Sequence, residues 1–288
     1  MPLGSLALVV FAATLHATWN LLAKRTTAPA IVFVFAYSVV ATLAYAPLAL
    51  WVALTQTSAW TLAALGFVIA GGLLHVAYSL TLQRGYAVAD LSVVYPVARG
   101  TSPMLSSSLA FLLLAEVPTP LRVGGILAIL AGILLISGLR LGRLQSPAAS
   151  VGVRWGVLVG VMSASYTIVD GSAVKLGGVH PVLLDWGANL LRVALLAPLA
   201  LRGDGLRAMG GQWGLAAGVG LLAPLGYILV LHALQLGAPL SVVAPLRELS
   251  MMVGTVLAVV VLKERMSPRR VAGCAAMAGG VVLLALSA

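Results

Sequence analysis

Charged residues are scarce in this chain of 288 residues. They make up 8% of the sequence, hydrophobic residues make up 61%, and the mean hydropathy is +1.09. A soluble domain carries about 25% charged residues, so this chain lacks the polar surface that water on every side would require. The composition therefore predicts an integral membrane protein that uses lipid as the solvent for most of its surface.

Cysteine and acidic residues are also rare, and each shortage excludes a class of site. Cys274 is the only cysteine, so the chain can form neither an internal disulfide nor a cysteine cluster for zinc. The 17 lysines and arginines outnumber the 7 acidic residues and give a formal net charge of +10. In a soluble protein this charge would suggest nucleic acid, but here most basic residues lie in short links between apolar runs. We therefore expect them to face membrane lipid and set the topology, with no nucleic-acid partner.

The motifs of common enzymes and ATP-driven pumps are missing as well. The sequence has no GxxxxGK[ST] phosphate loop, no GxSxG motif and no HExxH motif. These motifs supply the phosphate cradle, the nucleophile or the zinc ligands that such proteins need. We therefore predict a protein that is not an enzyme and that holds no cofactor and no metal.

Long apolar runs fill the chain, and Gly, Pro and charged residues separate them. A helix needs roughly 20 apolar residues to cross the hydrocarbon core. No alternation typical of a barrel is present, and lipid leaves only the helix to satisfy the backbone. We expect the first run to be a span and not a cleaved leader. The pattern predicts an all-α integral membrane protein with ten transmembrane helices near residues 5–23, 30–54, 60–82, 92–115, 121–139, 155–175, 181–201, 213–235, 240–262 and 270–287.

The two halves of the chain repeat each other. The segment SVVYP at Ser92–Pro96 returns as SVVAP at Ser241–Pro245, and Leu-Ala-Glu ending at Glu116 returns as Leu-Lys-Glu ending at Glu264. Because five spans is an odd number, the second copy crosses the membrane in the opposite sense. Such inverted repeats suit alternating access. We predict a first five-helix repeat over 1–139, a link over 140–154 and a second five-helix repeat over 155–288.

Basic residues are distributed unequally between the two sides of the predicted bundle. One side has only Arg122 and Lys175. By the positive-inside rule, the other side faces the cytoplasm. The sequence thus predicts a multi-pass inner-membrane protein with both termini in the periplasm. The cytoplasmic set comprises Lys24, Arg25, Arg84, Arg140, Arg143, Arg154, Arg202, Arg207, Lys263, Arg265, Arg269 and Arg270.

Two paired stretches carry a family resemblance. LQRGYAVADLSVVYPVARG at 82–100 and LQLGAPLSVVAPLRELS at 234–250 are each followed by a glutamate, a proline, a basic residue and a small-residue helix. The chain resembles, over nearly its whole length, the EamA-type group of the drug/metabolite transporter superfamily. The resemblance implies secondary transport of amino acids, nucleotide-related compounds, sugars or drugs without ATP. Arg247-Glu248 after the second proline departs from many relatives, so aromatic amino acids do not carry over as the substrate.

Six charged residues fall in the interior of the predicted spans, away from the charged residues at span ends. Each costs about 2.5–3.5 kcal/mol on insertion scales, which makes it a functional candidate. Three are basic and three acidic, so they balance either as structural ion pairs between helices or as a site for a zwitterion. Arg99 follows Pro96, and Arg247 follows Pro245. A proline frees backbone carbonyls of the preceding turn for ligand groups. The six are Arg99, Asp170, Asp185, Arg192, Arg247 and Glu248.

Polar and aromatic residues also share helix faces. His16, Trp19 and Asn20 have i, i+3, i+4 spacing, and the repeat aligns His16 and Asn20 with Tyr166 and Asp170. Similar faces occur in the third and seventh spans. We predict one central substrate-binding cavity lined by His16, Trp19, Asn20, His75, Tyr78, Tyr95, Arg99, Tyr166, Asp170, Trp186, Asn189, Arg192, Arg247 and Glu248.

The favoured hypothesis is a secondary exporter of small zwitterionic metabolites, such as amino acids or their analogues, that works by alternating access. Buried His and carboxyl groups make protons an available coupling partner. A lipid-linked carrier flippase is the alternative, and a non-transporting membrane enzyme or scaffold is a third hypothesis that the inverted repeat disfavours. The sequence leaves open whether the protein is a monomer or a homodimer.

Overall fold

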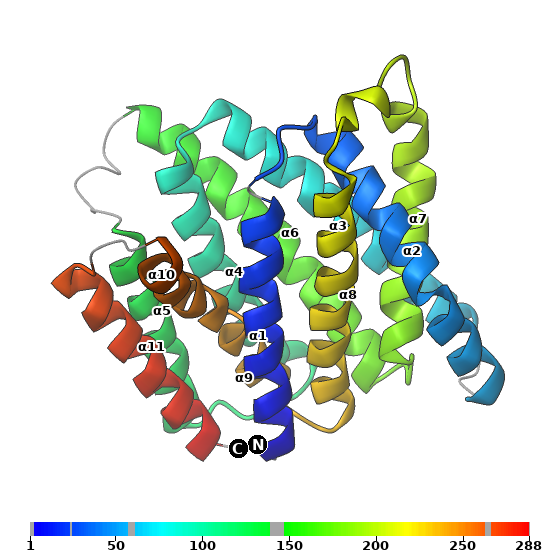
Figure 1. Cartoon of the computed structure of the whole chain (residues 1–288). Coiled ribbons are helices and arrows are strands. Elements are labelled where there is room, and N and C mark those ends of the chain that lie inside the picture. Colours follow the sequence, from blue (N-terminus) through cyan, green and yellow to red (C-terminus); the bar gives the residue numbers. More distant parts are fainter. Residues whose placement is uncertain (1–2, 24, 57–60, 139–146, 263–265, 288) are drawn as a thin grey trace.

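The computed structural model describes residues 3–23, 25–56, 61–138, 147–262 and 266–287. Throughout these ranges the regular structure is α-helical, apart from one turn of 3₁₀ helix at Arg207–Met209. The helices pack into one bundle, and α1 begins at the same end of it as α11 finishes (Figure 1). They are α1 (Leu3–Ala23), α2 (Ala30–Thr55), α3 (Leu62–Val88), α4 (Leu91–Leu113), α5 (Pro120–Ser137), α6 (Pro147–Lys175), α7 (Pro181–Ala200), α8 (Trp213–Gln235), α9 (Leu240–Leu246), α10 (Leu249–Leu262) and α11 (Pro268–Leu286).

Several helix starts follow directly from the local sequence. α5 and α11 both begin at a proline, which lacks the N–H that the first turn leaves unpaired. The residue before each proline caps the helix with its hydroxyl: Thr119 accepts from the amide of Arg122, and Ser267 accepts from the amide of Arg270. These caps use the same positions in the two repeats, as the sequence alignment requires.

The expected all-α architecture of ten spans is confirmed, with two corrections to its boundaries. Eight of the described helices are long and apolar enough to cross a membrane by themselves. The remaining two spans are α4, which carries Arg99 and several serines, and the ninth span, which is divided into α9 and α10. In addition, α6 begins at Pro147, inside the expected link over 140–154, where Pro-Ala-Ala-Ser is a competent first turn.

The ninth span, expected as one helix over 240–262, is interrupted at Arg247 and Glu248. Pro245 has no N–H to donate to the carbonyl of Ser241, one turn earlier. That carbonyl instead accepts a hydrogen bond from the hydroxyl of Ser107 on α4, at 3.1 Å. The proline therefore breaks the helix inside the bundle, where another helix replaces the lost backbone bond.

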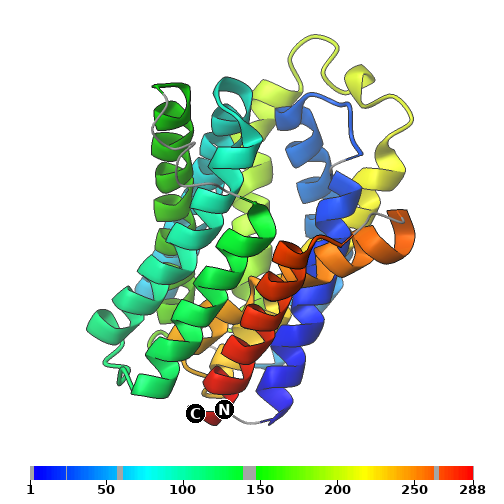
Figure 2. The same ribbon diagram turned by 90° about the vertical axis from the view of Figure 1, so that its left-hand side faces the viewer.

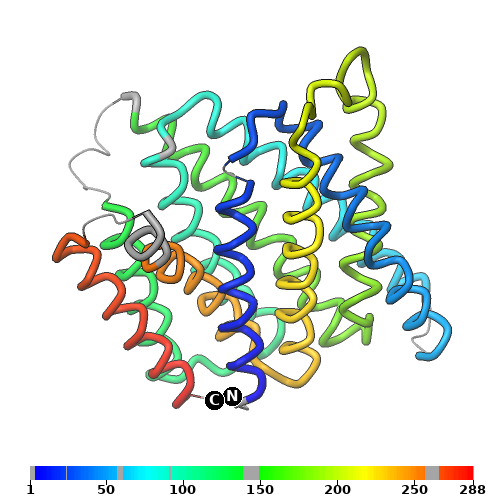
Figure 3. Tube along the Cα trace, viewed as in Figure 1, coloured from blue at the N-terminus to red at the C-terminus, as the bar shows by residue number. Residues whose placement is uncertain are grey.

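The helix contacts have the reciprocity of an inverted repeat. The first helix of each repeat packs against the third span of the other, α1 against α8 and α6 against α3. The second helices, α2 and α7, also pack together, as do the fifth, α5 and α11. The tube view shows α1 beside α8 (Figure 3), and the turned view shows α5 beside α11 (Figure 2). The site consequently lies between helices of both repeats, with residues from α1, α2, α3, α6, α7, α8 and the α9–α10 break in its lining.

Four glycines allow close approach of α5 and α11. Gly125 and Gly132 of α5 are buried against Gly280 and Gly273 of α11. A Cβ at Gly132 would overlap Met277 and lie 2.7 Å from the carbonyl oxygen of Gly273. Small residues at this seam therefore serve packing within one chain.

We predict that Gly132→Ala destabilises the protein by about 1–3 kcal/mol, because the carbonyl that it meets belongs to rigid backbone. The control is Gly124→Ala, about two turns earlier in the same helix, where the nearest atom to the new Cβ is Leu283 Cδ1 at 3.9 Å. Thermal unfolding of purified protein in detergent measures both. Equal midpoints for the two variants would contradict the packing of this seam.

Candidate functional site

Two buried charges join the fourth spans of the two repeats. Arg99 of α4 donates from Nη1 to Glu248 Oε2 at 3.1 Å, and its Nη2 lies 3.1 Å from His16 Nε2. Their side chains are only 16% and 8% exposed. The guanidinium also stands 5.1 Å from the ring centre of Tyr95. This pair is internally satisfied and links the broken ninth span to α4 and α1.

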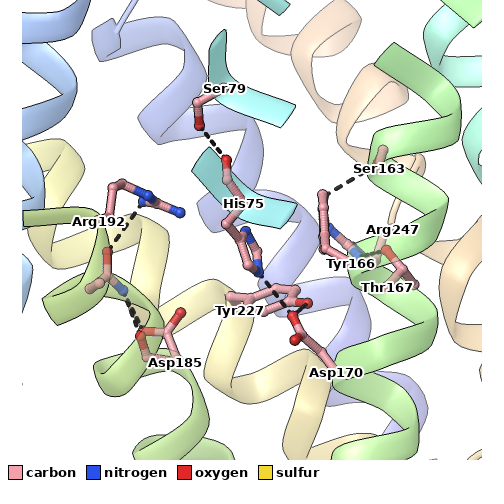
Figure 4. A network of polar contacts seen from close by, with 11 residues as sticks. His75, Ser79, Ser163, Tyr166, Thr167, Asp170, Asp185, Arg192, Tyr227 and Arg247 are labelled. Atoms are coloured by element: carbon pink, nitrogen blue, oxygen red, sulfur yellow. Dashed lines mark hydrogen bonds and ion pairs between the residues drawn. The ribbon is translucent and has the colours of Figure 1, made fainter. Parts of the chain in front are cut away.

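A cavity opens beside this pair, between helices of both repeats. It encloses about 900 Å³ of space outside the protein atoms, part of it open to the surroundings. Figure 4 shows a network of polar side chains in and behind its wall. A hollow with a few polar groups in an apolar wall is typical of a small-molecule site. Its polar and aromatic lining comprises His16, Trp19, Tyr37, His75, Tyr78, Ser79, Tyr166, Asp185, Asn189, Arg192, Tyr227 and Arg247.

Arg247 reaches the cavity from the break between α9 and α10. Its Nη1 donates to the hydroxyl of Thr167 and its Nη2 to that of Tyr166, both at 3.3 Å. The guanidinium is 5.2 Å from the ring centre of Tyr227 and 5.9 Å from that of Tyr166. Within the described part of the chain, no carboxylate lies within 4 Å of it. Neutral groups thus hold this cation in position and leave it available to an anion.

Asp185, Asn189 and Arg192 form a second polar cluster on one face of α7. The Asn189 amide donates from Nδ2 to Asp185 Oδ2 at 3.0 Å, and its Oδ1 accepts from Arg192 Nη1 at 3.3 Å. The acid and the guanidinium therefore bind the same amide and not each other. Both line the cavity, on the other side of His75 from Arg247 in Figure 4.

Asp170 of α6 lies behind the cavity wall in a third cluster. Its Oδ2 is 2.9 Å from His75 Nε2 and accepts a hydrogen bond from the Tyr227 hydroxyl at 2.5 Å. Its side chain is 2% exposed, and its Oδ1 has no hydrogen-bond partner among the described residues. Gly71 of α3 makes room for this oxygen, because a Cβ there would overlap it. The carboxyl thus depends on a titratable imidazole and a phenol for all its hydrogen bonds.

Glu116 holds the start of α9, at the end of the bundle where the termini lie. Its carboxylate accepts from the amides of Leu240 and Ser241 at 2.6 and 2.9 Å, from the Ser241 hydroxyl at 2.5 Å, and from Lys175 Nζ at 2.9 Å. We call these four residues the Glu116 latch. It joins the ends of α4 and α6 to the beginning of α9.

Burial of Glu116 acts to raise the pKa of its carboxyl, but the hydrogen bonds from Ser241, Lys175 and Leu240 outweigh burial and leave the pKa below its ordinary value. Because the pKa of Glu116 is lowered in the folded state, the latch contributes its full free energy of stabilisation at pH values above the ordinary pKa of a carboxyl group. Its contribution is lost only as pH falls through the lower, folded pKa.

The structure brings eight of the fourteen expected site residues to the cavity wall. They come from four helices, α1, α3, α6 and α7, and from the α9–α10 break, so polar faces of both repeats meet at the cavity. These eight are His16, Trp19, His75, Tyr78, Tyr166, Asn189, Arg192 and Arg247.

The other six expected residues lie outside the lining. The Asn20 amide donates to the His16 carbonyl of its own helix, and the Trp186 indole donates to the Thr42 carbonyl on α2. Tyr95 lies against Arg99, outside the cavity. The remaining three are buried in the ion pair Arg99–Glu248 and in the Asp170 cluster. Asn20 and Tyr95 contact residues of their own helix, whereas the other four have partners on neighbouring helices, which the sequence of one helix does not reveal.

Two aromatic residues of the site, Tyr37 and Tyr227, escaped the sequence analysis. Tyr37 lies 6.0 Å from the Arg192 guanidinium, and Tyr227 bonds Asp170. Neither tyrosine has a polar residue three or four positions away, so neither forms a polar face with near neighbours. Tyr227 does follow Pro224 by three residues, as Arg99 follows Pro96. A polar residue one turn after an intrahelical proline was the available signal.

Together, inverted five-span repeats and a polar cavity between them define a multi-pass helical membrane protein built around an internal site. Residues 3–138 and 150–286 each match the EamA-like transporter family, and the chain belongs to that family. It is therefore a transporter of the drug/metabolite type. No curated protein matches the chain significantly. A solved crystal structure with 19% identity has the same fold, with a TM-score of 0.80 over 99% of this chain and 98% of the other.

We predict that Glu248→Gln lowers the free energy of unfolding by about 3–5 kcal/mol, since it leaves the Arg99 cation buried without a counter-charge. The double variant Arg99→Met/Glu248→Met removes both charges and should cost less than the single one. Thermal unfolding in detergent measures both, with Asp204→Asn in the exposed Arg207 pair as the control. A double variant less stable than Glu248→Gln would contradict the pairing.

Proposed function

We propose that the protein is a secondary exporter of small zwitterionic metabolites, such as amino acids or close analogues, that works by alternating access and is driven by protons. The observation that carries the proposal is the cavity with Arg247 on one wall and Asp185 on another, neither in an ion pair within the described residues. A buried charge without a counter-charge is costly in a membrane. A zwitterion supplies both missing counter-charges at once.

The substrate carboxylate binds Arg247 in this proposal. A guanidinium presents two parallel N–H donors to a carboxylate, a geometry that lysine does not offer. Tyr166, Tyr227 and Thr167 already fix the position of this fork. The ammonium binds Asp185, whose Oδ2 otherwise accepts only from Asn189. Arg99, in contrast, is neutralised by Glu248 and serves as a link between helices.

Helix α9 connects the substrate to the latch. It is seven residues long, with the Glu116 latch at its start and Arg247 directly after its end. Binding at Arg247 therefore acts on the same short helix that the latch holds. We propose that release of the latch opens the cavity at the end where the termini lie, and that this end faces the periplasm of the inner membrane.

Arg247→Lys should abolish uptake of zwitterionic amino acids into proteoliposomes, because a lysine keeps the charge but not the fork. The matched control is Arg207→Lys at an exposed position, which should transport as the wild type does. Binding is measured separately as a thermal shift, since a ligand that binds only the folded state stabilises it. Wild-type rates in Arg247→Lys would exclude this binding mode.

Asp170 is the proposed proton carrier, since its carboxyl shares Oδ2 between His75 and Tyr227. The other charged or titratable groups that act on this cluster are Tyr166, Asp185, Arg192 and Arg247. Asp170→Asn should remove the stimulation of export by an imposed pH gradient, because an amide does not exchange a proton. Substrate export under an imposed pH gradient is compared with substrate counterflow in the absence of a pH gradient, in the same vesicles. A full response to the gradient in Asp170→Asn would contradict this role.

A further inference from the structure

We infer that the preferred substrate carries one ammonium group and two anionic groups, so that its net charge is −1. The inference rests on the proposed function and deepens it by naming the charge class of the zwitterion. The cavity lining contains two guanidinium groups, Arg192 and Arg247, and one carboxylate, Asp185. Two positive charges and one negative charge leave the lining with a net charge of +1. A zwitterion with one carboxylate does not balance this charge, whereas an acidic amino acid does.

When the substrate carboxylate binds Arg247, as proposed, Arg192 still lacks a counter-charge. Its Nη1 donates to the neutral Asn189 amide at 3.3 Å, and its guanidinium is 6.0 Å from the Tyr37 ring centre. Its Nε is buried and has no hydrogen-bond partner among the described residues. No carboxylate of those residues lies within 4 Å of it. An oxyanion is the ligand that satisfies both the charge and the open donor.

Two buried cations outside the cavity differ from Arg192 in this respect, whereas Arg122 of α5 bonds, among the described residues, only the carbonyls of Val117 and Ser287. Arg99 is paired with Glu248, and Lys175 is paired with Glu116. Asp170 lies behind the wall and is bonded to His75 and Tyr227, so it does not neutralise the lining directly. None of these groups therefore changes the net charge of the cavity lining.

The arrangement favours two separate anionic groups over one. Arg192 belongs to α7 and Arg247 to the α9–α10 break, and the two flank His75 in Figure 4. Asn189 keeps Asp185 and Arg192 apart, because it donates to one and accepts from the other. Each of the three charged groups thus has its own place on the wall. A short molecule with a carboxylate at each end and an ammonium beside one of them presents three matching groups.

The test compares acidic amino acids with their uncharged amides in proteoliposome counterflow. Glutamate and glutamine form one pair, aspartate and asparagine the other, and each pair differs by one charge at nearly constant shape. Wild-type protein should prefer the acidic member of at least one pair by about tenfold or more, the usual value of a hydrogen bond to a charged group. Arg192→Gln should reduce that preference by about tenfold or more. Arg207→Gln at an exposed position is the control and should leave the preference unchanged.

A purely structural role for Arg192 would lower transport of the acid and its amide alike and keep their ratio, which overturns the inference. Equal wild-type transport of both members of both pairs also overturns it, but if that transport depends on Arg247 the proposed function stands. Loss of Arg247 dependence, with the acidic preference retained, would instead overturn the proposed binding mode. If Arg192→Gln does not fold, Arg192→Lys serves in its place. A lysine keeps the charge, so it should keep part of the preference.

Discussion

Lipid offers no hydrogen bonds, and this one constraint organises the whole molecule. Backbone polar groups that face lipid must find their partners in the protein, because the hydrocarbon core holds no water. Most do so within their own helix, and the Thr42 hydroxyl likewise bonds the Ser38 carbonyl of its helix. Several charged groups instead bind across helices, as Arg99 does with Glu248 and Asp170 with His75, and they gather where helices of both repeats meet. The position of the site is thus a consequence of the solvent as much as of the fold.

Prolines within helices create the exceptions on which the site depends. Pro245 breaks the ninth span, and the break places Arg247 at the cavity and Glu248 against Arg99. The carbonyl that Pro245 cannot bond is satisfied by Ser107 from the other repeat. A short helix with polar groups at both of its ends results, and it is supported by contacts to α4 and not by its own length.

The two repeats share a fold but not a set of charges. His16 and Tyr166 occupy equivalent positions, and both line the cavity. Asn20 bonds its own helix, whereas its counterpart Asp170 binds His75 and Tyr227 across helices. Divergence at such equivalent positions makes an asymmetric site out of a symmetric scaffold. An asymmetric cavity is what a substrate with unlike ends requires.

The sequence by itself determined the membrane environment, the ten spans and the inverted repeat, because hydropathy, turn residues and internal similarity are local or pairwise properties of the chain. It also singled out the charged residues, since a charge in an apolar run is conspicuous whatever surrounds it. Only the tertiary structure decided which charges pair. Arg99 and Glu248 are 149 positions apart, and nothing in either helix indicates that they bond while Arg247, next to Glu248, bonds neutral hydroxyls instead. The role of Glu116 was hidden for the same reason, because the amides that it holds belong to a helix start 124 and 125 positions away. Partner choice in lipid depends on which helices adjoin, and that arrangement is a property of the packed bundle.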